Sequence, residues 1–425
     1  MSSIKRWAAI LFVNIALLAG SIFLANLYLD FDNFRRTQPE QERQRLEAEA
    51  RDIDAAYFRQ CLSQDHVQIF YPDLLRQERY RSISESTGFL PPGPIPHTAT
   101  AYCNEGNGFV RYTSDRFGFR NDDANWDRPV DVLFVGDSFV QGACVDEPYV
   151  LSNRVAERTG KNVVNIGTGS NGPNHYRALL DTFVPIVEPA YVVLVFFPND
   201  NVQIDADDAY STRQHGTPAA HYSRSGIDQQ GRDFYRAVRP LMEPTSGLTP
   251  KIDCDRVDLT FPDIQKQVKA DFSAQASANF GNAFVQYLQQ IDSREKVAGL
   301  VKLRALRGML ATIGQSETED PLTTPDATRA AIDALFEQCD GTCVPVIALL
   351  PGSEYWRSDW RTDTYLDFVT AYAKERAGNR DYKLLDARPL IDRNGLADFP
   401  PVGAHYSEEP YGRVGDAIAE TIGVE

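Results

Sequence analysis

Ser138 is the side chain with the clearest capacity for chemistry. It stands in Gly-Asp-Ser directly after the apolar run at 132–135, a pattern that predicts a buried strand, a sharp turn and the start of a helix. A serine hydroxyl at that point lies beside the unpaired N–H groups of a first helical turn, which places a nucleophile next to a site for an oxyanion. The alternative is that Asp137 or Ser138 only caps a helix.

Two further segments supply hydrogen-bond donors. A second apolar run ends in the glycine-rich turn at 167–172, and a third ends at Asn199. Gly169 or Ser170 offers a backbone N–H there, and Asn199 offers a side-chain N–H. Together with the N–H of Ser138, these groups are expected to form an oxyanion hole with three hydrogen-bond donors.

His405 is the candidate base. It stands in Gly-Ala-His-Tyr-Ser near the C-terminus, just before a last predicted helix at 413–421. A histidine in such a loop can take the proton of the serine. The other histidines lie in segments without this framing, although His175 follows the glycine-rich turn and can line the same pocket.

The elements that must position these residues are five predicted strands. They alternate with helical stretches, which predicts an α/β fold with a parallel sheet covered by helices on both faces. The site of such a sheet lies outside the carboxyl ends of its strands, where Ser138, the glycine-rich turn and Asn199 fall. The strands are predicted at 132–135, 162–166, 191–197, 344–350 and 382–386.

In order along the chain, the four segments resemble the four sequence blocks of the SGNH (GDSL-type) hydrolases. The resemblance covers about residues 115–202 and 344–425. It implies a flavodoxin-like three-layer sandwich, with Ser138 as nucleophile and His405 as base. It also implies an oxyanion hole made by the Ser138 N–H, the second-block loop and Asn199, and it implies neither a metal nor a cofactor.

The chain departs from this family at the catalytic acid. The family places an aspartate two or three residues before the histidine, and Val402 and Gly403 occupy those positions. Asp398 is the nearest carboxylate upstream and is the candidate acid. Otherwise a backbone carbonyl orients His405 in a Ser-His dyad. Loss of an orienting acid can cost several powers of ten in rate, so a non-catalytic scaffold subunit of a membrane or envelope complex is the alternative function.

The N-terminus predicts a membrane anchor. Lys5 and Arg6 precede an uncharged stretch at 7–29 that is long enough to span a bilayer, and they favour a cytoplasmic N-terminus. A cleaved signal peptide is the alternative. The predicted organisation is a tip and anchor at 1–29, a polar stalk helix at 30–62, an N-terminal extension at 63–128, and a hydrolase-like domain at 129–425 with a mainly helical insertion at about 203–343.

Composition sets the limits on partners. The chain has 425 residues and a net charge of −16, which argues against nucleic acid and a broad anionic surface as partners. Six scattered cysteines suit disulfides in an oxidising compartment, and Cys339 and Cys343 could close a small loop. Their spacing does not suit zinc.

These observations predict a single-pass inner-membrane protein whose C-terminal domain faces the periplasm. The predicted activity is that of a serine esterase or O-acyltransferase. The segment at 115–120 resembles family members that act on cell-envelope glycans, so O-acetyl groups on such a glycan, or a small ester, are the expected substrates. Envelope proteins are possible partners. The insertion, with two helices predicted at 263–314, is expected to roof the site.

Overall fold

The structure is a computed structural model. It describes the following residues: 7, 11–34, 68–69, 82–83, 86, 97, 99–102, 105, 110–169, 171–201, 233, 236–237, 284–285, 287–289, 294–314, 322, 325–353, 362–393, 397–400 and 403–423. Residues 35–62 of the stalk helix predicted at 30–62 lie outside these residues, and so does Ser170.

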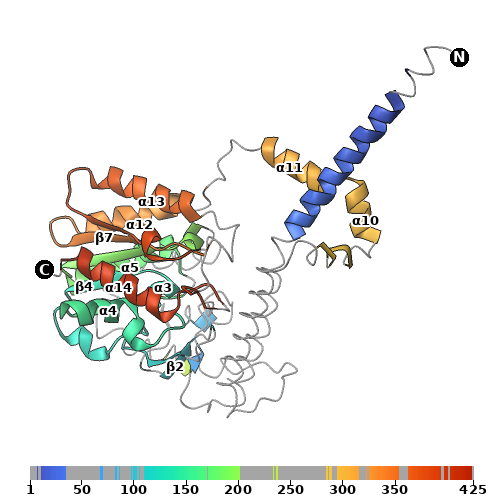
Figure 1. Ribbon diagram of the computed structural model, residues 1–425. Helices are drawn as coiled ribbons and strands as arrows, with labels where there is room; N and C mark the ends of the chain where they lie inside the picture. Colours follow the sequence, from blue (N-terminus) through green and yellow to red (C-terminus); the bar gives the residue numbers. More distant parts are fainter. Residues whose placement is uncertain are drawn as a thin grey trace, which may run out of the picture. The chain divides into compact units, whose positions relative to one another are not determined.

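A parallel sheet of five strands forms the centre of the larger unit (Figure 1). Its order is β5-β4-β6-β7-β8, so the chain runs outward from β4 to β5 and then returns to the other side of β4. This is the flavodoxin-like order of a doubly wound fold, and all five predicted strands are confirmed. The strands are β4 (Val132–Val135), β5 (Val163–Asn165), β6 (Tyr191–Phe196), β7 (Val344–Leu349) and β8 (Lys383–Asp386).

Helices cover both faces of this sheet (Figure 1). Alternate strand residues such as Leu133 and Leu194 belong to one core cluster with residues of α5 (Pro173–Val187), α12 (Pro325–Gln338) and α13 (Thr362–Ala377). The residues between them, such as Phe134, are equally buried but lie outside that cluster, because successive side chains of a strand point to opposite faces. The other layer contains α3 (Ser138–Gln141), α4 (Leu151–Thr159) and α14 (Glu408–Thr421).

A second, smaller sheet precedes the main one in the chain. It contains β1 (Gln68–Ile69), β2 (Ala99–Tyr102) and β3 (Val110–Thr113). Strand β1 pairs with β2 in parallel, and β2 pairs with β3 antiparallel, with Ala99 opposite Thr113 and Tyr102 opposite Val110. Residue 105 therefore lies in the connection of a β2–β3 hairpin.

A buried carboxylate ties the segment after β3 to the main sheet. Asp115 accepts hydrogen bonds from the backbone N–H groups of Phe117 and Phe119, from the Asn121 amide at 2.7 Å and from the Trp126 indole at 2.7 Å. Asn121 in turn exchanges two hydrogen bonds with the backbone of Asn165 at the end of β5. The segment that precedes β4 is thus fixed against the edge where the site residues gather.

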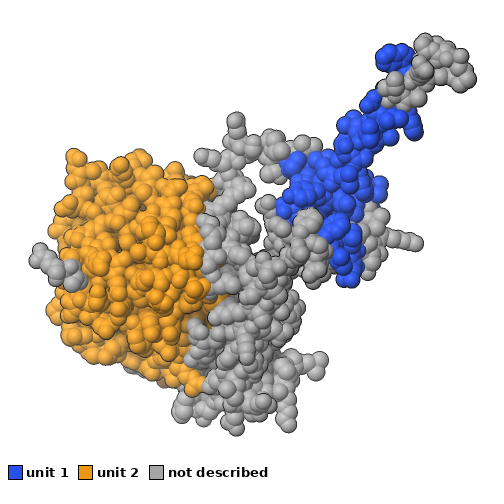
Figure 2. Space-filling view, in the orientation of Figure 1, with its two compact units in different colours: residues 1–46, 266–321 blue, residues 47–265, 322–425 orange. Residues whose placement is uncertain are grey.

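The second compact unit combines the N-terminus with part of the insertion. It comprises Met1–Leu46 and Lys266–Pro321 (Figure 2). Its N-terminal helix, described over Leu11–Phe34, is long and apolar enough to cross a membrane, and signal sequences share these properties. The insertion contributes α10 (Arg294–Val301) and α11 (Arg304–Gly314).

Polar contacts join these elements near the end of the apolar helix. The Asn26 amide donates to the carbonyl of Leu300 at 3.3 Å and accepts from the N–H of Leu306 at 3.0 Å. Tyr287 donates its hydroxyl to Asp30 at 2.7 Å. The predicted helices of the insertion therefore contact the apolar helix, and the expectation that the insertion roofs the site stays a prediction.

The end of the insertion differs from the sequence-based prediction. Helix α12 lies within the predicted range of 203–343, yet it packs against α5 and the sheet as part of the sandwich. Its apolar face, with Ala331, Ile332 and Leu335 buried, is a core face. Helical periodicity alone does not distinguish such a face from one that packs within an insertion.

The small disulfide loop is present as predicted. Cys339 and Cys343 are bonded across the turn between α12 and β7. Cys144 is also disulfide-bonded, to a partner outside the described residues.

Candidate active site

Ser138 lies at the point where β4 ends and α3 begins. Asp137 is the N-cap of α3, and its carboxylate accepts the N–H of Phe139 at 2.9 Å. Gly136 makes the turn possible, because a Cβ at this position would overlap Val140. The Ser138 side chain is consequently held at the carboxyl edge of the sheet, beside the switch point between β4 and β6.

His405 faces Ser138 directly. Its Nε2 and the Oγ of Ser138 are 2.8 Å apart, although the residues are separated by 267 positions in the chain. The Phe139 ring packs in a tilted arrangement with its centroid 4.9 Å from that of the His405 ring and 4.1 Å from that of Phe197. Tyr406 donates its hydroxyl to the carbonyl of Pro351 at 2.6 Å. These contacts limit the orientations that the imidazole can adopt.

A carboxylate that the sequence did not single out contacts the other nitrogen of this imidazole. Oε1 of Glu105, from the β2–β3 connection, lies 2.8 Å from His405 Nδ1. Its side chain is 13% exposed and that of His405 is 19% exposed. The serine, the histidine and this carboxylate thus form one continuous chain of hydrogen bonds.

Asp398, the predicted acid, has different partners. Its carboxylate accepts the backbone N–H of Asp392 at 2.7 Å and forms an ion pair with Arg413. It is buried there, at the start of the turn that leads to His405. The structure therefore places Asp398 in a structural ion pair, and the prediction that it contacts the histidine is corrected.

The predicted oxyanion donors are only partly assembled. The Ser138 N–H, in the first turn of α3, has no partner within its own helix. Gly169, by contrast, donates its N–H to Oε1 of Gln141 at 2.7 Å, so that N–H is not available to a substrate oxygen. Ser170, the other second-block candidate, lies outside the described residues.

Asn199 lies on the turn that follows β6, at Pro198–Asn201. Asp200 fixes this turn, because its carboxylate accepts the N–H of Phe197 at 2.9 Å and the hydroxyl of Tyr176 at 2.6 Å. The Oδ1 atom of Asn199 is buried without a hydrogen-bond partner among the described residues. Burial raises the pKa of the Asp137 carboxyl, and the adjacent Asn199 amide is one of the groups that offset part of this rise.

Gln141 connects the hairpin to this edge of the sheet. While its Oε1 accepts from Gly169, its Nε2 donates to the hydroxyl of Tyr112 in β3 at 3.0 Å. Arg120, which is buried, donates to the carbonyls of Gly142 at 2.6 Å and Val145 at 3.1 Å. These bonds hold the loop after α3 against the segment that carries β3.

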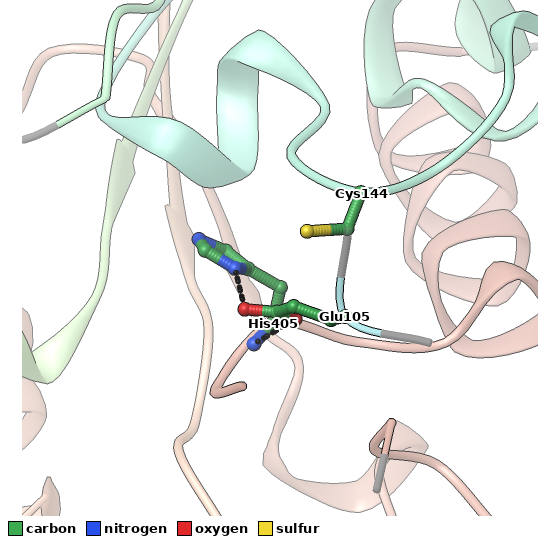
Figure 3. Close-up of side chains that lie close together, drawn as sticks. All are labelled: Glu105, Cys144 and His405. Atoms are coloured by element: carbon green, nitrogen blue, oxygen red, sulfur yellow. Dashed lines mark hydrogen bonds and ion pairs between the residues drawn. The ribbon is translucent and has the colours of Figure 1, made fainter. Parts of the chain in front are cut away.

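Glu105, Cys144 and His405 lie close enough together to suggest a metal site (Figure 3). One ligand atom from each lies within 4.8 Å of the others. However, Cys144 is disulfide-bonded and offers no thiolate, which is the form that binds metal. The histidine is also already bonded to Glu105 and Ser138. The donor set therefore does not fit a metal ion.

Glu105 could not be identified from the sequence, because none of the residues around it marks it as catalytic. It precedes His405 by 300 residues and lies in the segment predicted to be an N-terminal extension. The one available signal was Gly403, a glycine at a position where the resembled family has an aspartate.

Comparison with known proteins gives likeness only at the level of solved structures. No protein family model and no curated protein matches the chain. An α/β hydrolase from the metagenome of Lake Arreo, Spain, is 11% identical, with a TM-score of 0.34, and covers 69% of this chain and 97% of its own. A catalytic mutant of an acetylxylan esterase from Geobacillus stearothermophilus is 12% identical, also with a TM-score of 0.34, and covers 70% and 95%. Likeness at this level does not establish a shared family or activity.

Proposed function

We propose that this chain is a serine esterase or O-acyltransferase in which Ser138 is the nucleophile and His405 the base. The observation that carries the proposal is the 2.8 Å contact between Ser138 Oγ and His405 Nε2 at the carboxyl edge of the sheet. A serine within hydrogen-bond reach of a histidine that is itself oriented by a third group is the arrangement needed for covalent acyl transfer.

The reaction proceeds in two halves. Ser138 Oγ attacks the ester carbonyl carbon while His405 Nε2 takes the hydroxyl proton, and the carbonyl electron pair moves to oxygen. Collapse of this intermediate expels the alcohol, which takes the proton from His405 and leaves an acyl ester on Ser138. Water or a sugar hydroxyl then attacks the acyl group by the same steps in reverse, and Ser138 regains its proton.

The N–H groups at the sheet edge bind the oxyanion in both halves. The Ser138 N–H and the Asn199 amide are the described candidates, and Ser170 is the candidate from the second-block loop because the N–H of Gly169 is already donated. Donors fixed before the reaction stabilise the developing charge without reorganisation. Loss of one such donor typically costs about 10²–10³-fold in kcat.

The substrate class we propose is an O-acetyl group on a cell-envelope glycan, which rests on the resemblance of residues 115–120 to envelope-acting enzymes. We also propose that the apolar N-terminal helix anchors the chain in the inner membrane and that the sandwich faces the periplasm. The bonded cysteines Cys144, Cys339 and Cys343 support an oxidising compartment.

Covalent labelling tests the chemistry. The full chain in detergent micelles is treated with a fluorophosphonate, and peptide mass analysis is expected to find the label on Ser138. Ser138→Ala is expected to abolish labelling, and His405→Ala to slow it by several powers of ten. Absence of label on a folded wild-type chain would reject the serine mechanism and favour the scaffold function.

Product analysis distinguishes the two reaction types. With 4-nitrophenyl acetate as donor, hydrolysis releases acetate, whereas transfer gives an acetylated sugar when a glycan oligosaccharide is present. Mass spectrometry of the oligosaccharide, compared with the Ser138→Ala chain, shows which acceptor is used.

A further inference from the structure

We propose that Glu105 is the positioning acid of this site, supplied by the β2–β3 hairpin in place of the aspartate that the resembled family has beside its histidine. The inference rests on the proposed function, and it assigns the orienting role to a residue in the segment predicted to be an extension. It makes that hairpin an integral part of the catalytic domain.

The first support is the set of contacts made by the Glu105 carboxylate. Oε1 lies 2.8 Å from His405 Nδ1 and accepts the N–H of Ala404 at 3.1 Å, and Oε2 accepts the N–H of His405 at 3.2 Å. An ionised carboxylate is only an acceptor, so the proton of the neutral imidazole is on Nδ1. That tautomer leaves the lone pair of Nε2 directed at Ser138 Oγ, as a general base requires.

The second support is the space that the carboxylate occupies. A Cβ built on Gly403 would overlap the Glu105 carboxyl group, and Gly403 is the residue two positions before His405. The φ angle of Gly403 is +103°, a conformation that side chains other than glycine rarely adopt. Glu105 occupies the space that a side chain at position 403 would need. Its presence therefore explains why this chain has glycine at position 403, where the resembled family has its aspartate.

The third support is that the hairpin is anchored to the helix that carries the nucleophile. Tyr102 and Tyr112, on paired strands, pack together with Ala143 in one buried cluster. Tyr112 also accepts a hydrogen bond from Gln141, the last residue of α3. Glu105 follows Tyr102 by three positions, so its backbone comes from a strand that is fixed relative to Ser138.

The negative charge of Glu105 explains how this residue would assist the reaction. When His405 takes the serine proton it becomes positively charged, and a carboxylate 2.8 Å from Nδ1 stabilises that form. The Nδ1 proton stays on the histidine throughout. Asp398 is neutralised by Arg413 and makes no described contact with the imidazole, so it does not substitute for this effect.

The experiment compares two carboxylates. Glu105→Gln and Asp398→Asn are made in the full chain, and the rate of fluorophosphonate labelling at Ser138 and of 4-nitrophenyl acetate hydrolysis is followed from pH 5 to 9. Glu105→Gln is expected to lower both rates by about 10²–10⁴-fold and to move the acid limb of the profile to lower pH by about one unit or more. Asp398→Asn is expected to keep the wild-type profile.

Chemical rescue separates positioning from folding. Glu105→Ala leaves a space beside Nδ1, and formate is expected to raise its labelling rate in a saturable manner, whereas chloride at the same ionic strength should not. Asp398→Ala should not respond to formate. Circular dichroism of each variant reports whether the chain is folded.

The outcomes distinguish the two proposals. If wild type is labelled at Ser138 and Glu105→Gln matches it in rate and pH profile, the role of Glu105 is overturned while the serine mechanism stands. If Asp398→Asn alone shows the shifted profile, the acid is Asp398. If the folded wild type is not labelled, the proposed function fails before this inference is reached.

Discussion

Replacement of Gly403 by alanine tests whether the contact between Glu105 and His405 depends on the absence of a side chain at position 403. The new methyl group would overlap the Glu105 carboxyl group, so the carboxylate has to leave Nδ1 of His405 or the loop has to shift. Either movement breaks the 2.8 Å contact. We expect kcat to fall by about 10²–10⁴-fold, equivalent to about 3–5 kcal/mol of transition-state stabilisation. The positive φ adds about 1–3 kcal/mol of strain to the folded state.

A double-mutant cycle isolates the overlap from the strain. Gly403→Ala is combined with Glu105→Gly, which removes the side chain that the methyl group would meet. Because the contact with the imidazole is already lost in Glu105→Gly, the second substitution is expected to change kcat by less than about tenfold in that background. The assay is hydrolysis of 4-nitrophenyl acetate by the full chain in micelles, with urea unfolding to follow stability.

Additive effects would refute this reasoning. If Gly403→Ala lowers kcat by the same factor with and without the Glu105 side chain, the alanine acts through the backbone alone. If Gly403→Ala leaves kcat unchanged in a chain that retains Glu105, the carboxylate does not need the space at position 403.

Three further predictions concern other parts of the chain. Asp115→Asn removes acceptor capacity and can place an amide NH₂ group against the indole N–H of Trp126, so that two donors face each other. We expect this to lower the free energy of unfolding by about 1–3 kcal/mol. Burial raises the pKa of Asp115 from 3.8 to about 6. This group therefore makes the free energy of unfolding fall as the pH rises from about 4 to 6. Urea unfolding of Asp115→Asn at several pH values should not show that fall. Cys144 is expected to be found in a disulfide when the unreduced chain is mapped by mass spectrometry, and a free Cys144 thiol would contradict this. Asn26→Leu removes both hydrogen bonds to the insertion and is expected to speed proteolysis within 294–314 by at least about threefold, whereas equal cleavage rates would show that the bonds do not hold these helices.

The local sequence pattern is sufficient to predict the main sheet. Four of its five strands are buried along almost their whole length, as in 132–135 and 191–196, and the edge strand β8 is partly buried. Continuous burial leaves a local pattern that does not depend on which elements cover the faces. The candidate nucleophile and base are also predictable, since Ser138 follows a predicted strand and His405 stands in a short loop before a predicted helix.

Features that arise from packing between distant segments were not predictable. Helix α12 falls within the range that the sequence predicts to be an insertion, because the periodicity of an apolar helix face does not show which element it packs against. The sequence offers the N–H of Gly169 as an oxyanion donor, and only the folded chain places Gln141 where its side chain accepts that N–H. The same limit applies to Asn26, a mildly polar residue in an apolar stretch, whose two partners are more than 270 positions away.

The carboxylate that contacts His405 shows most clearly which features depend on tertiary packing and not on local sequence. Asp398 was the natural candidate because it is near in sequence, yet its charge is paired with Arg413. Glu105 reaches the imidazole from 300 residues upstream because a hairpin is docked beside α3. An orienting hydrogen bond requires a separation of about 3 Å between atoms. Position along the chain does not determine that separation, and here only the tertiary packing of the hairpin does.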